Sequence, residues 1–429
     1  MRFLISTLGS FGDVAPFISI ALGLKERGHE VLFVVNPYHR KVLEKWGLEM
    51  VPAGDAEAME SRFRDPRVNH LLHVIDYLSE AATAELREHY DAIAANITPD
   101  TVIVYRGTML APRLVEEKFG NPACGVYLTA IELSGVEDRP QGLGHIFNPV
   151  MRHMPARLFS FAEKVYFKRF IDRPLLPAVN GLRQEIGLPK VEGHIRNWLM
   201  GTRMTIGLYP EWYGFGGKHL TPSFRNTGFA FLPTDETTPL DPALEAFLAD
   251  GPPPVVISRG SALRYADDLV ERIQSACREL GQRSLLLSFD HQGPPEVDGD
   301  HCVSAPVSIG RVLPRCKALV HRGGVGAMAD ALRFGIPQLI LGQSIDHPDN
   351  GERVTRLSAG RWLFTLTTTY RMMVRALDAV VNDPAIAAGA REISDRFDVD
   401  GWMEETLDLI ESIGPGEVSG KTQPVSRSA

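Results

Sequence analysis

The chain has 429 residues, of which 44% are hydrophobic and 23% are charged, and its formal net charge is −8. This length exceeds what one ordinary core holds, so we expect two domains, and the acidic balance argues against nucleic acid as a main partner. Cys124, Cys277, Cys302 and Cys316 are scattered without a paired spacing, which argues against structural disulfides and against a zinc site.

The chain opens directly on an apolar run at residues 2–7, with no segment typical of a signal peptide and no apolar run long enough to span a membrane. We therefore expect a cytoplasmic protein. A glycine-rich loop follows this first predicted strand, and residues 16–28 have helical spacing, with proline in the first turn and glycine at the end. Residues 29–35 form the next predicted strand, and the order of strand, helix and strand predicts a parallel sheet.

A polar, proline-rich stretch begins near residue 233, and a second alternation of strands and helices starts with an apolar run at residues 255–258. This change of texture predicts two domains joined by a linker. The expected organisation is an N-terminal domain (1–233), a linker (234–250), a C-terminal domain (251–395), a C-terminal helix that packs back on the N-terminal domain (396–413) and a disordered tail (414–429).

The most distinctive motif lies at residues 320–328, where a predicted strand ends in a glycine turn and a short helix begins. A glycine turn lets the backbone approach a ligand closely, and the first N–H groups of the helix have no intrahelical partners and carry partial positive charge. His321 and Arg322 add two basic side chains. The motif therefore predicts a diphosphate site, although such turns are also common structural elements of α/β proteins.

A polar cluster from Asp346 to Asn350 follows the next predicted strand, at residues 338–341, and offers groups that could hold sugar hydroxyls. Together with the phosphate motif it indicates a nucleotide-sugar site. In open α/β sheets the ligand lies past the carboxyl ends of the strands. The fold class we expect is therefore α/β, with two Rossmann-like, doubly wound domains that face each other across a cleft.

Three segments carry a resemblance that runs over nearly the whole sequence: Gly9 to Pro16, Arg259-Gly260-Ser261, and His321 to Asn350. In these segments the sequence resembles the GT-B glycosyltransferases of the UDP-glycosyltransferase type. The Gly-Asp-Val form of the first loop is that of the bacterial branch. The form of residues 321 to 328 most resembles that of the rhamnosyltransferases of rhamnolipid synthesis.

The resemblance implies an inverting transfer of a sugar from a UDP- or dTDP-sugar to a hydroxyl of an apolar small-molecule or lipid-like acceptor. It implies that the N-terminal domain binds the acceptor and the C-terminal domain binds the nucleotide sugar. No cofactor or metal is expected, and the sequence agrees in having no Asp-x-Asp motif in a suitable loop and no His/Cys metal spacing.

Asp13 is the candidate catalytic base. An inverting transfer needs a group that takes the acceptor proton while the hydroxyl attacks the anomeric carbon. Many relatives place a histidine in this loop, but here the loop has none, so the aspartate is the candidate. The structural alternative is that Asp13 is only the N-cap of a helix that starts near Val14.

The donor side has a larger set of candidates. Relatives carry a histidine directly before the Gly-Gly pair, whereas here Arg322 stands there and His321 one place earlier, which leaves open which of the two touches phosphate. Asp346 would accept hydrogen bonds from the sugar, while Asp349 and Asn350 could instead cap a helix that starts near Gly351. The predicted donor-binding residues are Gly12, Gly260, Ser261, Val307, His321, Arg322, Gly323, Gly324, Val325, Gly326, Ala327, Asp346 and His347.

The acceptor side has weaker signals. Residues 151–170 are basic and aromatic, which favours either a lid that admits a lipid-like acceptor and contacts a membrane face, or an ordinary domain helix with a solvated Lys/Arg face. The predicted acceptor-binding residues are Phe11, His70, His73, Tyr77 and Phe161.

Two other functions fit the same fold: a sugar-nucleotide 2-epimerase, and a non-catalytic activator of a partner glycosyltransferase. The sequence does not identify the sugar, the nucleobase, the acceptor or the oligomeric state.

Overall fold

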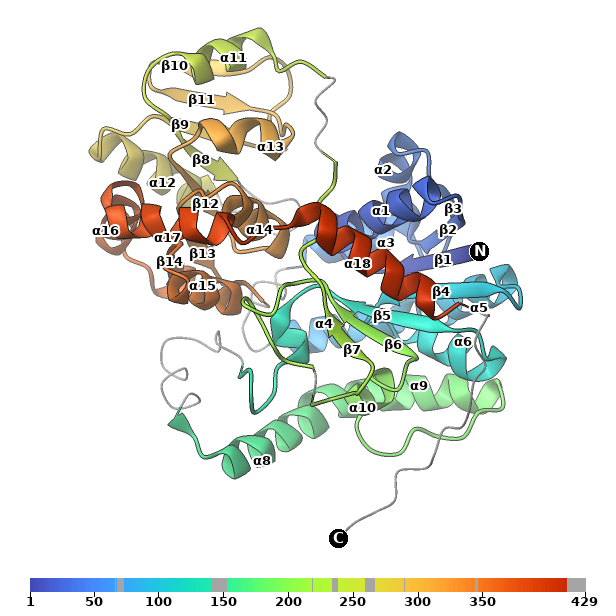
Figure 1. The fold of residues 1–429 in the computed structure, drawn as a ribbon. Helices are drawn as coiled ribbons and strands as arrows, with labels where there is room; N and C mark the ends of the chain where they lie inside the picture. The colour runs from blue at the N-terminus through green and yellow to red at the C-terminus, as the bar shows by residue number, and fades with distance from the viewer. Residues whose placement is uncertain are drawn as a thin grey trace.

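The computed structural model describes residues 1–65, 67, 73–139, 153–217, 219–233, 238–258, 267–288, 290–343 and 346–414. Within these residues the protein forms two α/β halves, each built on a seven-stranded sheet (Figure 1). The predicted fold class is confirmed. His70, Gly260 and Ser261, together with residues 234–237 of the predicted linker and residues 415–429 of the predicted tail, lie outside the described residues.

The N-terminal sheet has the strand order β3-β2-β1-β4-β5-β6-β7 and every neighbouring pair is parallel. Its strands read as nearly continuous apolar runs because helices cover both faces. The strands are β1 (Arg2–Thr7), β2 (Glu30–Val35), β3 (Glu49–Pro52), β4 (Thr101–Arg106), β5 (Ala123–Tyr127), β6 (Met204–Gly207) and β7 (Phe224–Asn226).

The helices of this half are α1 (Phe11–Glu26), η1 (Pro37–His39), α2 (Arg40–Lys45), α3 (Ala56–Phe63), α4 (Val74–Ala84), α5 (Leu86–Asn96), α6 (Ala111–Phe119), η3 (Ala130–Leu133), α8 (Ala156–Tyr166), η4 (Phe167–Asp172), α9 (Arg173–Glu185) and α10 (Ile195–Leu199).

The C-terminal sheet has the order β10-β11-β9-β8-β12-β13-β14, and only the pair of β10 with β11 is antiparallel among the described strands. The strands are β8 (Val255–Ser258), β9 (Ser284–Leu287), β10 (Glu296–Asp298), β11 (His301–Ser304), β12 (Ala318–His321), β13 (Gln338–Gly342) and β14 (Gly360–Phe364). The helices are α11 (Pro242–Ala249), α12 (Asp267–Glu279), α13 (Ile309–Val312), η5 (Leu313–Arg315), α14 (Val325–Arg333), α15 (His347–Arg356), η6 (Thr365–Thr367), α16 (Tyr370–Asn382), α17 (Pro384–Ser394) and α18 (Val399–Ser412).

Each sheet has one point where the strand order reverses. In the N-terminal half β1 pairs with both β2 and β4, and in the C-terminal half β8 pairs with both β9 and β12. Ligands of open α/β sheets bind past the carboxyl ends of the strands at such a point. The loop after β1 and the turn after β12 both lie there.

Helix α18 returns from the C-terminal half and lies on α1 (Figure 1). Its Leu407 and Ile410 are buried in the same core as the apolar face of α1, and burying two such side chains contributes several kcal/mol. At the rim, the Arg27 guanidinium pairs with Glu404, Asp408 and Glu411.

Helix α11 falls inside the stretch predicted to be a linker, so the predicted linker was too long. Asp241 accepts a hydrogen bond from the Ala243 amide at 2.8 Å and caps the helix, and Pro242 follows at its first position. Leu244 and Phe247 are buried in the core of the C-terminal half. The proline-rich composition therefore marks a helix start here.

Candidate active site

Asp13 lies in the first turn of α1, not at its N-cap. The helix begins at Phe11 and Ser10 is the cap residue, so Asp13 is not the N-cap of a helix starting near Val14, but its side chain completes the capping box from the third helical position. One carboxylate oxygen of Asp13 accepts from the Ser10 amide at 2.8 Å and from its hydroxyl at 3.1 Å. A Cβ on Gly9 would lie 2.4 Å from that oxygen, and Gly9 has φ +121°, so only glycine fits there.

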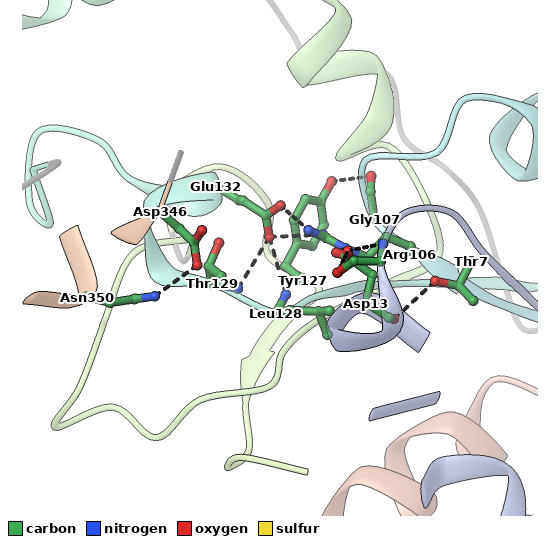
Figure 2. A network of polar contacts seen from close by, with 11 residues as sticks. Thr7, Asp13, Arg106, Gly107, Tyr127, Leu128, Thr129, Glu132, Asp346 and Asn350 are labelled. Carbon is green, nitrogen blue, oxygen red and sulfur yellow. Dashed lines mark hydrogen bonds and ion pairs between the residues drawn. The ribbon is translucent and has the colours of Figure 1, made fainter. Parts of the chain in front are cut away.

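The other oxygen of Asp13 faces Arg106, the last residue of β4 (Figure 2). Arg106 Nε lies 3.3 Å from Asp13 Oδ1, and the two terminal nitrogens of the guanidinium pair with Glu132 of η3. Burial opposes the charge of Arg106, but the carboxylates of Glu132 and Asp13 outweigh it and raise the pKa of the guanidinium. Arg106 therefore stays charged and joins the two carboxylates.

The turn between β12 and α14 combines a tightly packed glycine with two open ones. Gly323 has φ +103°, and a Cβ there would lie 2.8 Å from Ile340 and 3.1 Å from His347. By contrast, a Cβ on Gly324 or Gly326 would meet nothing within 4 Å. The fold itself does not require glycine at these two positions, and their lack of a side chain leaves the N-terminus of α14 accessible to a ligand.

His321 is buried and both of its ring nitrogens have protein partners. Nδ1 accepts from the Gly323 amide at 3.2 Å, and Nε2 faces the Gln338 side-chain oxygen at 2.9 Å. Burial lowers the pKa of His321 to about 4, so the ring is neutral near pH 7. This geometry argues against the predicted phosphate contact by His321, whose ring instead holds the glycine turn. Arg322 is also largely buried, at the same strand end.

Asp346 is the N-cap residue of α15, which begins at His347. The prediction that Asp349 and Asn350 cap a helix near Gly351 was wrong, because Pro348 already occupies the first turn. Instead, the Asn350 side-chain amide donates to the Gly323 carbonyl and to Asp346 Oδ2, both at 2.8 Å. Asn350 thus ties the start of α15 to the glycine turn.

His347 is buried beneath the same turn. Its Cβ lies 3.1 Å from the position that a Cβ would take on Gly323 or on Gly342. Burial and, to a smaller extent, the nearby Arg322 and His321 lower the pKa of His347 to about 3. Near pH 7 the ring is therefore neutral, packed behind Asp346.

Asp346 of the C-terminal half lies on the side of Glu132, which shares Arg106 with Asp13 of the N-terminal half (Figure 2). Burial and, to a smaller extent, the negative charges of Glu132 and Asp13 raise the pKa of Asp346 to about 7. The predicted sugar-binding residue and the predicted base therefore lie in the same region, where the two halves meet.

We expect replacement of Asp346 by asparagine to change the pH dependence of stability. A carboxyl whose pKa is raised by folding destabilises the folded state, and this effect is absent below about pH 4 and complete above about pH 7. The free energy of unfolding of Asp346→Asn, relative to that of the wild type, should therefore be about 2–4 kcal/mol higher at pH 8 than at pH 4. Urea unfolding of both proteins at pH 4 and pH 8 measures this change. The same stability difference between variant and wild type at the two pH values would contradict the prediction.

The predicted acceptor residues have different surroundings. Phe11 is exposed in the first turn of α1, two residues before Asp13. Tyr77 is buried and its hydroxyl donates to the Arg62 carbonyl at 3.1 Å, so it does not line an open pocket as predicted. His73 is exposed at the start of α4, and Phe161 is exposed on α8. On the donor side, half-buried Val307 follows β11 at the carboxyl edge of the sheet.

A buried ion cluster joins the two halves and was not predicted. Arg353 of α15 is 1% exposed and contacts Asp349 at 2.7 Å and Asp138 of the N-terminal half at 3.1 Å. It also donates to the Tyr213 carbonyl at 2.8 Å, and the Tyr213 hydroxyl donates to Asn350. The cluster fixes α15, and with it Asp346, against the N-terminal half.

Among the residues that the structure describes, no group of three or more His, Cys, Asp or Glu side chains is arranged to hold a metal ion. In the same residues, no helix is long and apolar enough to cross a membrane.

Family models match both halves of the protein. Residues 3–118 match the glycosyltransferase family 28 N-terminal domain, and residues 294–405 match the erythromycin biosynthesis protein CIII-like C-terminal domain. O-mycaminosyltylonolide 6-deoxyallosyltransferase of Streptomyces fradiae is 28% identical over 430 residues, which cover 96% of this chain and 97% of that protein.

Solved structures share the fold. The kitacinnamycin glycotransferase superposes with a TM-score of 0.70 at 19% identity, and the glycosyltransferase VinC in complex with dTDP with a TM-score of 0.66 at 19% identity. Each comparison covers 96% of this chain and 99% of the other.

This protein belongs to the bacterial GT-B glycosyltransferases of the family 1 type. It is an enzyme that transfers sugars, of the natural-product glycosyltransferase type. The finer likeness to the rhamnosyltransferases of rhamnolipid synthesis stays a prediction.

Proposed function

We propose that the enzyme transfers a sugar, with inversion and without a metal ion, from a dTDP- or UDP-sugar to a hydroxyl of an apolar acceptor. The observation that carries this proposal is the nearness of Asp346, at the start of α15, to Asp13 and Glu132 of the other half. A donor held at the adjacent end of α14 would have its sugar between the two. The dTDP bound to the structural relative VinC supports a nucleoside diphosphate as the ligand.

The diphosphate would bind the backbone amides of residues 325–327, where the helix end and Arg322 offset its charge. The acceptor oxygen would form a bond to the anomeric carbon as the bond from that carbon to the phosphate oxygen breaks. The diphosphate leaves with the electron pair, and Asp13 takes the hydroxyl proton. Arg106 would hold the Asp13 carboxylate in place while it accepts this proton.

A thermal-shift screen of UDP- and dTDP-sugars tests the donor class, because a ligand that binds only the folded state raises the unfolding temperature. Incubation with the donor alone then separates transfer from the alternative of 2-epimerisation, since an epimerase alters the sugar without an acceptor. A protein that binds the donor but transfers to no acceptor would favour the activator alternative.

We expect Gly326→Leu to weaken donor binding at least about tenfold, which corresponds to about 1.4 kcal/mol, without loss of stability. Gly326 is an exposed glycine in the first turn of α14 with open space around it. Leucine favours a helix more than glycine does, so the fold should tolerate it while the side chain covers the amides. Isothermal titration with dTDP and UDP measures the affinity.

Gly181→Leu is the matched control, because Gly181 is likewise an exposed helical glycine with nothing within 4 Å, but lies on α9. It should leave nucleotide binding unchanged. Equal nucleotide affinity of the wild type and Gly326→Leu would show that the diphosphate does not bind at the end of α14.

A further inference from the structure

Helix α8 has one face that no part of the described protein covers. Leu158, Phe161 and Val165 are 53%, 65% and 50% exposed. They are spaced three and four residues apart, so they share one side of the helix. Large apolar side chains that are exposed together on one face indicate contact with another surface.

The opposite face anchors the helix to the N-terminal half. Phe159 is buried, and the Arg139 guanidinium lies 4.9 Å from the centre of its ring. Glu163 accepts from Arg196 at 3.0 Å, and Arg196 in turn lies 4.8 Å from the ring of Phe167. The helix is therefore fixed to the N-terminal half, while Leu158, Phe161 and Val165 stay exposed.

Basic residues flank the exposed apolar face. Residues 156–173 contain five basic and two acidic residues in a protein of net charge −8. Both acidic residues are held within the protein, Glu163 by Arg196 and Asp172 by His194 at 2.6 Å. The exposed basic residues are Arg157, Lys164, Lys168, Arg169 and Arg173.

The helical spacing places these charges beside the apolar residues. Arg157 and Lys164 are seven residues apart, on one flank of the line formed by Leu158, Phe161 and Val165. A helix with bulky apolar side chains on its outer face and lysine or arginine beside them is suited to lie in the plane of an anionic lipid surface.

We propose that α8 and the start of η4 dock the enzyme on an anionic membrane surface, with Leu158, Phe161 and Val165 inserted among the lipid chains and Arg157, Lys164 and Lys168 at the lipid phosphates. This contact does not depend on the identity of the sugar or the acceptor. The basic residues around α8 favour an anionic lipid as the partner. Anionic lipid would attract α8 but repel the remainder of this acidic protein.

Vesicle co-sedimentation tests this proposal. The wild type should bind vesicles of phosphatidylglycerol and phosphatidylcholine in equal parts, bind vesicles of phosphatidylcholine alone much more weakly, and dissociate as salt is raised. Phe161→Glu should lower the partition onto the anionic vesicles at least about tenfold, because it removes the aromatic ring that the lipid would bury and adds a repelled charge. The double variant K164E/K168E should lower it by a similar factor.

Matched variants elsewhere in the protein control for general changes. Leu366→Glu changes a side chain that is 61% exposed on the C-terminal half, and K41E/K45E reverses two exposed charges at the same spacing on α2. Both should bind like the wild type, and all variants should unfold at the wild-type temperature because the changed side chains are exposed.

Three results would overturn the proposal: no binding of the wild type to the anionic vesicles, equal loss in the α2 double variant, or unchanged binding by Phe161→Glu. Light scattering tests the rival explanation, that the exposed face of α8 binds a second copy of the protein. A wild-type dimer that Phe161→Glu converts to a monomer would assign this face to a second copy of the protein instead.

Discussion

Asp13→Asn is expected to lower kcat for sugar transfer by about 10²- to 10⁴-fold, the range typical of a lost general base. Donor affinity should stay within about twofold of the wild type, because the proposed contacts to the diphosphate come from α14 on the other half. Asparagine keeps the oxygen that accepts from the Ser10 amide, so the first turn of α1 should persist. Single-turnover transfer and nucleotide titration measure the two quantities.

Thr7→Val serves as the control for Asp13. The Thr7 hydroxyl donates to the Asp13 backbone carbonyl at 3.1 Å, so its removal disturbs the same loop but leaves the carboxylate in place. We expect less than about a threefold loss of kcat from this change, since one neutral hydrogen bond contributes about 1 kcal/mol or less to the loop. Equal losses in both variants, or a parallel loss of donor binding in Asp13→Asn, would make Asp13 structural.

Arg353→Met is expected to destabilise the protein by about 3–5 kcal/mol. The change leaves Asp138 and Asp349 buried without their cation, and unpaired buried charge is strongly unfavourable. The midpoint of urea unfolding measures the loss.

The triple variant D138N/D349N/R353M should recover most of that stability, because it removes the two stranded charges along with the arginine. Arg396→Met, which breaks an exposed pair with Glu392, should change stability by about 1 kcal/mol or less. Equal effects of Arg353→Met and Arg396→Met would mean that the cluster does not hold the halves together.

The sequence predicted the parts of the site that are local along the polypeptide. The segment from Gly9 to Asp13 and the turn from Gly323 to Gly326 are each encoded within a few residues, because glycine positions and helix starts have short-range signatures. The starts of α1, α11 and α15 were nevertheless misplaced or missed, and at α11 and α15 a proline one or two residues after an aspartate was the available signal.

The partners of these local motifs could not be predicted because they come from distant parts of the sequence. Arg106 meets Asp13 only because β1 and β4 pair in parallel, with Ser6 beside Tyr105. A charged residue at the end of the otherwise apolar strand β4 was a usable signal. No sequence pattern predicts the contact between Asp138 and Arg353, because this contact depends on how the two halves pack.

The roles of buried histidines also depended on tertiary contacts. From sequence His321 has the residue type and position of a phosphate ligand, but its ring is held between Gln338 and the Gly323 amide. A side chain at the end of a central strand can point into the sheet packing or toward the ligand, and the sequence alone does not distinguish these cases.

The most direct test of the account is a crystal structure of the enzyme with bound thymidine diphosphate. We predict that the diphosphate oxygens lie about 3 Å from the amides of residues 325–327, with the terminal phosphate directed toward Asp346 and Asp13. A nucleotide bound away from α14, with the helix end facing only solvent, would contradict the central claim.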